Sequence, residues 1–229
     1  MKKLVVLTGA GMSAESGLPT FRDMGGIWEQ YDVTQVASPE AWRDNPELVL
    51  RFYNERRKKL FESAPNEGHN ILASFEEFFN VHIVTQNVDD LHEQAGSSKV
   101  LHLHGELKKA RSTSNPNLIY ELKDWELKLG DLCDEGSQLR PHIVWFGEVV
   151  EEIYNAQHLV SEADVFIVVG TSLNVYPAAG LLQYIASDVP LFVVDPGQPS
   201  LGHNPQITIV KEKASEGLRK LTDVLKKLA

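Results

Sequence analysis

The residues with the most evident chemical use form a glycine-rich stretch, GAGMSAESGLPTFR, at positions 9–22. The apolar run before it predicts a buried strand that ends at this turn. Gly9 and Gly11 allow the backbone to approach a pyrophosphate closely, and Ala14 takes the third place of the dinucleotide-binding GxGxxG pattern in its G/A form. Small or polar residues at positions 13, 15 and 16 suit a helix N-terminus, which favours an anion. The stretch indicates a dinucleotide site, although the carboxylate that dehydrogenases carry about 20 residues further on is missing.

The chain after this turn differs from that of a dehydrogenase. Gly17 and Pro19 break the helix early. Phe21 and Arg22 are then expected on a loop over the dinucleotide, where a ring can cover nicotinamide and a guanidinium can bind phosphate. A helix end followed by a plain turn explains these residues equally well.

Polar side chains also follow the apolar run at 81–85. In TQNVDDLH, residues 85–92, Gln86, Asn87 and Asp89 stand at the end of the predicted strand, where they can hydrogen-bond an amide, a ribose or a water. Asn87 or Asp89 could instead cap the helix that contains Leu91.

Two histidines stand two residues apart in VLHLHGE, residues 100–106, and so point the same way on a strand. No adjacent cysteine or third histidine would complete a zinc site, so metal binding explains them poorly. A neutral imidazole is well suited to take a proton from a ribose hydroxyl near neutral pH.

Two later strand ends carry further candidates. Gly170, Thr171 and Ser172 follow the run at 165–169 and offer donors to a phosphate, or an N-cap to a helix. Asp195 ends the run at 191–194 with a carboxylate that could bind a ribose hydroxyl.

The order of apolar runs predicts the fold. Runs at 4–7, 81–85, 143–145, 165–169, 191–194 and 207–210 are typical of buried strands, with amphipathic segments between most of them and helical spacing at 218–228. This alternation predicts an α/β fold with a doubly wound, Rossmann-like parallel sheet. Residues 32–67, helical and strand-free, and 106–139, polar and irregular, are interpreted as insertions forming a small domain. Residues 1–31, 68–105 and 140–229 would form the larger, Rossmann-like domain that binds the dinucleotide.

The helical insertion contains PELVLRFYNERRKKL, with apolar residues on one face. Tyr53 and Arg56 share a face of this helix. They are either a packing aromatic beside a solvated arginine or a pair able to hold a carboxylate. RRKK at 56–59 is a local basic patch.

Composition limits the possible functions. The net charge of −10 argues against a general nucleic-acid or anionic-membrane binder. No apolar stretch is long enough to span a bilayer, and the first apolar run is too short for a signal peptide. Cys133 is the single cysteine, which rules out an intramolecular disulfide framework and leads us to expect a cytoplasmic protein.

Together, GAGMSAESGLPTFR, TQNVDDLH, LHG, LRPHIVWFGE and GTSLNVYPAA resemble, in order, the signatures of the sirtuins, NAD-dependent protein-lysine deacylases. The resemblance implies NAD as cofactor and nicotinamide and O-acyl-ADP-ribose as products. It makes His104 the general base and His102 structural, with Asn87 and Asp89 completing the catalytic set. The implied NAD-binding residues come from all parts of the chain: Gly9, Ala10, Gly11, Ser13, Glu15, Thr20, Phe21, Arg22, Trp28, Gln86, Asn87, Val88, Asp89, Gly170, Thr171, Ser172, Asp195, Pro196, Gly197 and Ala214.

Other features are similar to the sirtuins that remove acidic acyl groups. Tyr53 and Arg56 would bind the distal carboxylate of succinyl- or malonyl-lysine, and Ala37 would widen the acyl pocket. The acyl-lysine tunnel and the groove for an extended substrate peptide would be lined by Val144, Phe146 and Gly147. Acylated-lysine proteins or peptides are thus the expected partners of a chain expected to be a monomer.

The second insertion departs from the family pattern. Most sirtuins have four zinc-binding cysteines here, whereas this chain has Ser112, Ser114 and Asn115 near the first pair and only Cys133 near the second. One thiolate cannot make a tetrahedral structural site, so we predict no zinc. Apolar packing would hold the module instead, by Leu118, Ile119, Tyr120, Trp125, Leu127 and Leu129. A further departure from the family pattern lies outside this insertion, at Asp195, where many sirtuins have Asn.

Three other functions remain open. Protein ADP-ribosylation would use the same cofactor. A non-catalytic module would bind NAD or ADP-ribose, but it would have no use for the base His104. An oxidoreductase is disfavoured by Phe21 and Arg22 directly after the turn and by the missing ribose carboxylate.

Overall fold

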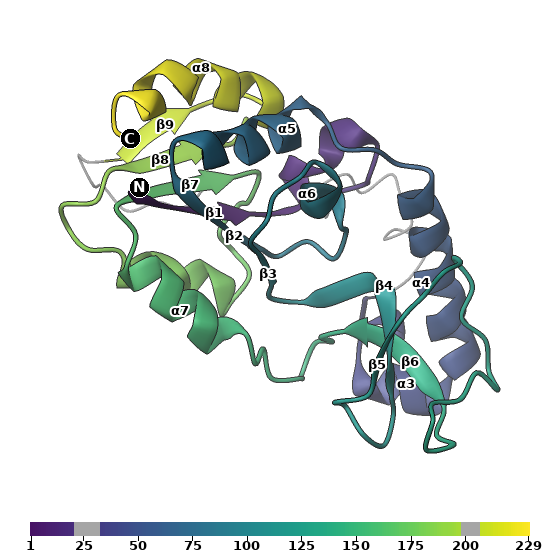
Figure 1. Cartoon of the computed structure of the whole chain (residues 1–229). Helices are drawn as coiled ribbons and strands as arrows, with labels where there is room; N and C mark the ends of the chain where they lie inside the picture. The colour runs from purple at the N-terminus through teal and green to yellow at the C-terminus, as the bar shows by residue number, and fades with distance from the viewer. Residues whose placement is uncertain (21–32, 198–206) are drawn as a thin grey trace.

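The computed structural model describes residues 1–20, 33–197 and 207–229, which form two sheets with helices around them (Figure 1). The larger sheet has six strands in the order β3-β2-β1-β7-β8-β9, and all of its pairings are parallel. Its strands are β1 (Lys3–Thr8), β2 (Asn80–Thr85), β3 (Val100–His102), β7 (Val165–Val169), β8 (Leu191–Val194) and β9 (Ile207–Val210). The chain winds outward in both directions from the β1–β7 pair, which confirms the predicted doubly wound fold.

Apolar side chains on both faces of the central strands bury the sheet between two layers of helices. On one face the core includes α5 (Glu67–Ser74) and α8 (Ala214–Lys226), and on the other α7 (Ile153–Ser161) and the 3-10 helix η4 (Ala178–Tyr184) (Figure 1). Every residue of β7 and β8 is buried. Strands buried on both faces need continuous apolar runs, which is why these two coincide with the predicted ranges.

Residues 33–66 and 105–143, which we call the small domain, lie to one side of the larger sheet (Figure 1). It contains α2 (Val33–Val36), α3 (Pro39–Asp44), α4 (Pro46–Phe61) and an antiparallel sheet in the order β5-β4-β6. Those strands are β4 (Gly105–Ser112), β5 (Ile119–Glu121) and β6 (Leu139–Ile143). Ser38 and Asn45 fix the starts of α3 and α4, because each side chain accepts a hydrogen bond from a first-turn amide and is followed by proline.

Three predictions of local structure are wrong. Residues 143–145 do not form a strand of the larger sheet; Ile143 ends β6, and with Trp145 it packs against Phe52 of α4. Residues 106–139 are not irregular, because they contain β5 and most of β4. The glycine-rich stretch was expected to begin a regular helix, but it forms two short 3-10 turns, η1 (Ala10–Met12) and η2 (Ala14–Ser16). Gly17, with a φ of +80°, ends the second turn.

Buried hydrogen bonds attach the second insertion to α4. The fully buried Arg57 guanidinium donates to the carbonyl oxygen of Leu107 and, at 2.8 Å, to that of Trp125. Asn54 bonds both backbone groups of Leu127, at 2.9 and 3.0 Å, and its Oδ1 also accepts from Arg57. Burial lowers the pKa of Arg57 to about 10, so the group stays charged at neutral pH.

Where the family pattern places cysteines, this chain has a hydrogen-bonded cluster. The Cys133 thiol donates to Ser112 Oγ at 3.3 Å, and Ser114 Oγ connects Ser112, at 3.2 Å, with Ser137, at 2.7 Å. Within the described ranges, no group of three or more His, Cys, Asp or Glu side chains could hold a metal ion. The same part of the chain contains no helix that is long and apolar enough to cross a membrane.

The predicted apolar packing of this insertion is correct only in part. Leu118, Tyr120 and Leu127 join the cluster around Cys133. Placing Ile119 and Leu129 there was wrong, since both are 46% exposed. Strand alternation explains the exposure of Ile119, because its neighbour Tyr120 points to the buried face of β5. Leu129 lies outside that strand, in a turn. Trp125 is half-buried, and the ammonium of Lys58 lies 5.3 Å from its ring centre.

Replacing Arg57 by leucine should lower the free energy of unfolding by about 2–4 kcal/mol, because buried carbonyl oxygens would lose their donor. Arg51→Leu, at an exposed position of the same helix, is the matched control and should change it by less than about 0.5 kcal/mol. Urea unfolding of both variants measures the difference; equal losses would contradict the role given to Arg57.

Acid should destabilise the fold partly through His69. This residue is fully buried, and burial lowers its pKa from 6.5 to about 4. Between these values the unfolded chain binds a proton that the folded chain does not, so stability falls by about 3 kcal/mol as pH drops through this window. His69→Gln retains an acceptor for the Asn66 amide in the α5 capping box but cannot titrate. Urea unfolding at pH 7, 5.5 and 4 should show a weaker pH dependence for this variant; an unchanged dependence would exclude His69.

Candidate active site

The loops that follow β1 and β7 touch backbone to backbone at the carboxyl edge of the larger sheet. Gly9 N donates to Val169 O at 3.0 Å, and Gly11 N donates to Gly170 O at 2.9 Å. A Cβ on Gly9 would lie 2.6 Å from Thr171 Cβ, and one on Gly170, whose φ is +63°, would lie 2.4 Å from Met12 N. The glycines are thus needed for contact between loops, at the point where doubly wound sheets bind ligands.

Three predicted residues from two loops form one buried network beside this contact. Asn87 Nδ2 donates to Gly9 O and to Ser13 Oγ, both at 3.1 Å, and Ser13 Oγ donates to Asp89 Oδ2 at 2.9 Å. Burial raises the pKa of Asp89, while hydrogen bonds from Ser13 and the Leu91 amide oppose that rise. The network holds an amide and a carboxyl group in fixed orientations at the edge of the sheet.

His104 lies between β3 and β4 with one ring nitrogen already engaged. Its Nδ1 is 2.9 Å from Gln86 O, an acceptor, so Nδ1 carries the hydrogen and the Nε2 lone pair is left for a ligand. Burial lowers the pKa of His104, and the bond to Gln86 only partly opposes this. A Cβ on Gly105, whose φ is +81°, would lie 2.1 Å from His142 O, which explains the glycine after the histidine. His104 is therefore a neutral base.

The small domain contributes a phenol and a guanidinium. The Tyr53 hydroxyl is buried and accepts a hydrogen bond from Trp145 Nε1 at 3.0 Å. Burial raises the pKa of Tyr53 to about 12, so the phenol stays protonated. Burial lowers the pKa of the half-buried Arg56, and electrostatic interactions with Tyr53 and Asp89 oppose this. Arg56 therefore interacts electrostatically with Tyr53 of the small domain and with Asp89 in the loop after β2.

Residues 144–147 connect the two parts of the site. Val144 N donates to His104 O and Phe146 N to Ala37 O, both at 3.0 Å. Ala37 is buried, Val144 is half-buried, and Phe146 and Gly147 are exposed. The segment therefore runs past His104 and Ala37 with its last two residues exposed.

Two residues of the same motif were not assigned a role from the sequence. Arg140 lies 3.3 Å from the ring centre of Trp145 and bonds Glu148 at 2.7 Å, while Glu148 Oε2 accepts from Trp145 N at 2.8 Å. Burial alone would raise the pKa of Glu148, but these two donors outweigh it and the pKa is lowered. The opposite charges flanking an apolar run, LRPHIVWFGE, are the signal that could have identified the pair.

The other predicted NAD-binding residues lie in several places. Glu15 accepts from the Ser215 amide at 2.9 Å, at the start of α8, and the buried Ala214 belongs to the core beneath. Asp195 is 3% exposed and accepts from Gly197 N at 2.7 Å. Gln86 Nε2 donates to Thr171 Oγ1 at 3.1 Å. That these residues bind NAD stays a prediction, as it does for Ala10, Thr20, Val88, Ser172 and Pro196. Phe21, Arg22 and Trp28 lie outside the described residues.

Fold and site together define a doubly wound α/β protein with buried polar side chains gathered at the carboxyl edge of its larger sheet. Residues 9–177 match the Sir2 family, and the chain belongs to this family, the sirtuins. An "NAD-dependent protein deacylase" of Bacteroides thetaiotaomicron is 54% identical and covers 98% of both chains, and one of Helicobacter pylori is 50% identical over 100% of both.

Solved structures give the same assignment. A Sir2 homologue in complex with NAD matches with a TM-score of 0.88 and 40% identity, covering 100% of this chain and 91% of that one. A Sir2 protein with a deacetylated peptide and acetyl-ADP-ribose matches with a TM-score of 0.83 and 33% identity, covering 97% and 93%.

The His104 ring should titrate below the usual value. We expect its Cε1 proton resonance, assigned by its absence from His104→Gln, to show a midpoint below 6.5, because burial disfavours the imidazolium. The measurement is a proton NMR titration of the free protein. A midpoint at or above 6.5 would show that the ring is charged near neutrality and unsuited to act as a base.

Proposed function

We propose that this chain is an NAD-dependent protein-lysine deacylase that removes acetyl groups and also the acidic succinyl and malonyl groups. The observation that carries the proposal is the state of His104, a neutral imidazole with Nδ1 bonded to Gln86 O and Nε2 open, in a chain whose relatives are named protein deacylases. A charge of −10 and a single cysteine support a cytoplasmic enzyme, and nothing in its sequence requires more than one copy.

The residues present fit NAD. The glycine loops, with Gly170 at positive φ, bring backbone to the sheet edge without side chains in the way. NAD supplies a ribose carbon that accepts the acyl oxygen once nicotinamide leaves. His104 Nε2 takes the proton of a ribose hydroxyl, and its bond to Gln86 O keeps the ring in the right tautomer. Asn87 and Asp89, fixed by Ser13, present polar groups that need no reorganisation during reaction.

Tyr53 and Arg56 support the acidic acyl groups. Because Trp145 donates to the Tyr53 hydroxyl, the phenol keeps its own proton to give to an acceptor. A carboxylate beside Arg56 would stabilise the guanidinium charge, which burial disfavours. An acetyl group offers neither contact. Acyl-lysine peptides would reach the pair along Val144 and Phe146, which lie next to His104 and Ala37.

A panel of one peptide bearing acetyl-, butyryl- or succinyl-lysine tests the proposal by mass spectrometry, with and without NAD. Wild type should remove acyl groups only with NAD, and His104→Ala should lower kcat/KM by roughly 100-fold or more for all peptides. Arg56→Met should lower kcat/KM for the succinyl peptide by about 10- to 100-fold through the lost charged hydrogen bonds, and change acetyl little. Arg51→Met, exposed on the same helix, is the control.

Each other result has a distinct meaning. Equal losses on succinyl and acetyl peptides in Arg56→Met would reject the carboxylate role but not the deacylase. NAD binding with all peptides untouched would favour a binding module. Mass gain of an ADP-ribose unit on the peptide would favour ADP-ribosyl transfer.

A further inference from the structure

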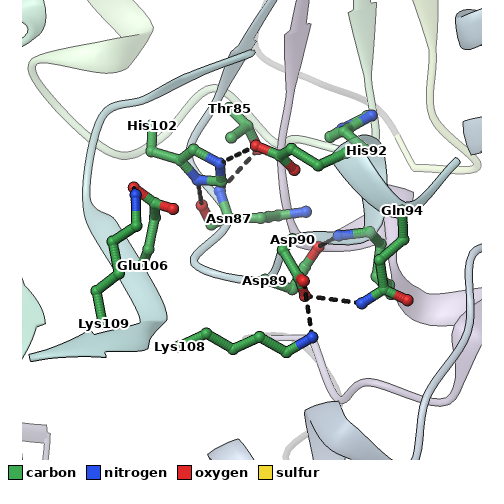
Figure 2. A network of polar contacts seen from close by, with 12 residues as sticks. Thr85, Asn87, Asp89, Asp90, His92, Gln94, His102, Glu106, Lys108 and Lys109 are labelled. Atoms are coloured by element: carbon green, nitrogen blue, oxygen red, sulfur yellow. Dashed lines mark hydrogen bonds and ion pairs between the residues drawn. The ribbon is translucent and has the colours of Figure 1, made fainter. Parts of the chain in front are cut away.

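His102 lies between two hydrogen-bond acceptors. Its Nε2 is 2.8 Å from Glu93 Oε1, and its Nδ1 is 3.2 Å from Asn87 O. A backbone carbonyl can only accept, and so can an ionised carboxylate. Both contacts are hydrogen bonds only when both ring nitrogens carry hydrogen, that is, when His102 is an imidazolium. Figure 2 shows the ring beside Asn87 and the acidic side chains around it.

The charges around His102 favour this form. Its side chain is 7% exposed, and burial alone would lower its pKa, but Glu93 on α6 (Leu91–Gln94) and Glu106 on β4 outweigh burial and raise it. Asp89 on the same loop adds negative charge, while His92 is neutral because burial holds its pKa well below 6.5. Lys109 ion-pairs with Glu106 at 2.8 Å (Figure 2). His102 and His104 therefore differ in charge at the same pH.

The carbonyl that accepts from His102 belongs to Asn87, which is also held through its backbone N–H and its Nδ2. Asn87 N donates to Thr85 Oγ1 at 3.0 Å, and Nδ2 donates to Gly9 O and Ser13 Oγ. Loss of the Nδ1 hydrogen would turn a hydrogen bond into repulsion between a lone pair and the Asn87 carbonyl oxygen. Among these contacts of Asn87, the one to His102 is made by a titratable side chain.

We propose that the His102–Glu93 pair is a positioning device for the loop of residues 87–89, and that loss of the His102 proton ends activity at alkaline pH. The proposal rests on the proposed function. The enzyme is then active in the pH range in which His104 is deprotonated and His102 is protonated. Activity falls on the acid side as His104 gains a proton, and on the alkaline side as His102 loses one.

Glu93→Gln tests the proposal because it retains the shape of the side chain and removes its charge. In profiles of kcat/KM for NAD against pH, the alkaline limb should move down by about one unit while the acid limb stays. Asp90→Asn is the matched control. It removes the charge of the residue that follows this loop, and with it the 2.7 Å ion pair to Lys108 of β4, without changing a contact of His102 (Figure 2). It should leave both limbs in place. An unmoved limb in Glu93→Gln, or an equal shift in Asp90→Asn, would overturn the proposal.

An NMR titration without NAD separates this proposal from the proposed function. The His102 Cε1 proton and the Asn87 side-chain amide signals should change with one shared midpoint above 6.5, and both should shift together in Glu93→Gln. Asn87 signals that ignore the His102 titration would overturn the positioning role, whether or not the chain deacylates peptides. Shared midpoints in a protein inactive on every peptide would leave the role intact and reject only the activity.

Discussion

The whole site depends on the contact between the loops that follow β1 and β7. A Cβ on Gly9, Gly11 or Gly170 would approach the opposing loop to between 2.4 and 2.7 Å, so the loops meet where only glycine allows it. Asn87 bonds Gly9 O, and Ser13, in the same loop as Gly9, bonds both Asn87 and Asp89. Separation of the two loops would therefore displace the amide and the carboxyl group together. Polar groups that cannot move are those that stabilise developing charge most effectively.

A second constraint concerns protonation. His102 and His104 belong to one short segment, both are largely buried, and burial acts on both in the same direction. They differ because His102 faces a carboxylate and a carbonyl oxygen, whereas His104 has only the carbonyl oxygen of Gln86. Because His102 has one more acceptor beside it than His104, the His102 ring is charged and the His104 ring is neutral. Neither state follows from the residue type or from the spacing in LHLHG.

Sequence patterns predicted the parts of the fold that depend on local order. Buried parallel strands need continuous apolar runs, so β7 and β8 could be placed to the residue. The run at 143–145 is equally apolar, but its side chains pack against α4, and hydrophobicity alone does not say which surface buries a residue. The glycine loop, Asn87 and His104 were predicted by family resemblance, and the structure brings them together. Arg57 was not assigned a role, because its backbone partners are carbonyls 50 and 68 residues away that only the fold brings near.

The helix α4 carries both Tyr53 and Arg56 and the side chains that hold the second insertion. RRKK was expected to be a basic patch, but Arg57 is fully buried and Arg56 half-buried, so that only Lys58 and Lys59 are exposed. Successive helical residues point about 100° apart, so Arg56 faces Tyr53 and the catalytic loop while Arg57 faces the second insertion. The hydrogen bonds of Arg57 and Asn54 to backbone carbonyls in that insertion hold it against the helix that carries Tyr53 and Arg56. In the part of the chain that the structure describes, this insertion is therefore held to α4 by hydrogen bonds from the same helix that carries Tyr53 and Arg56.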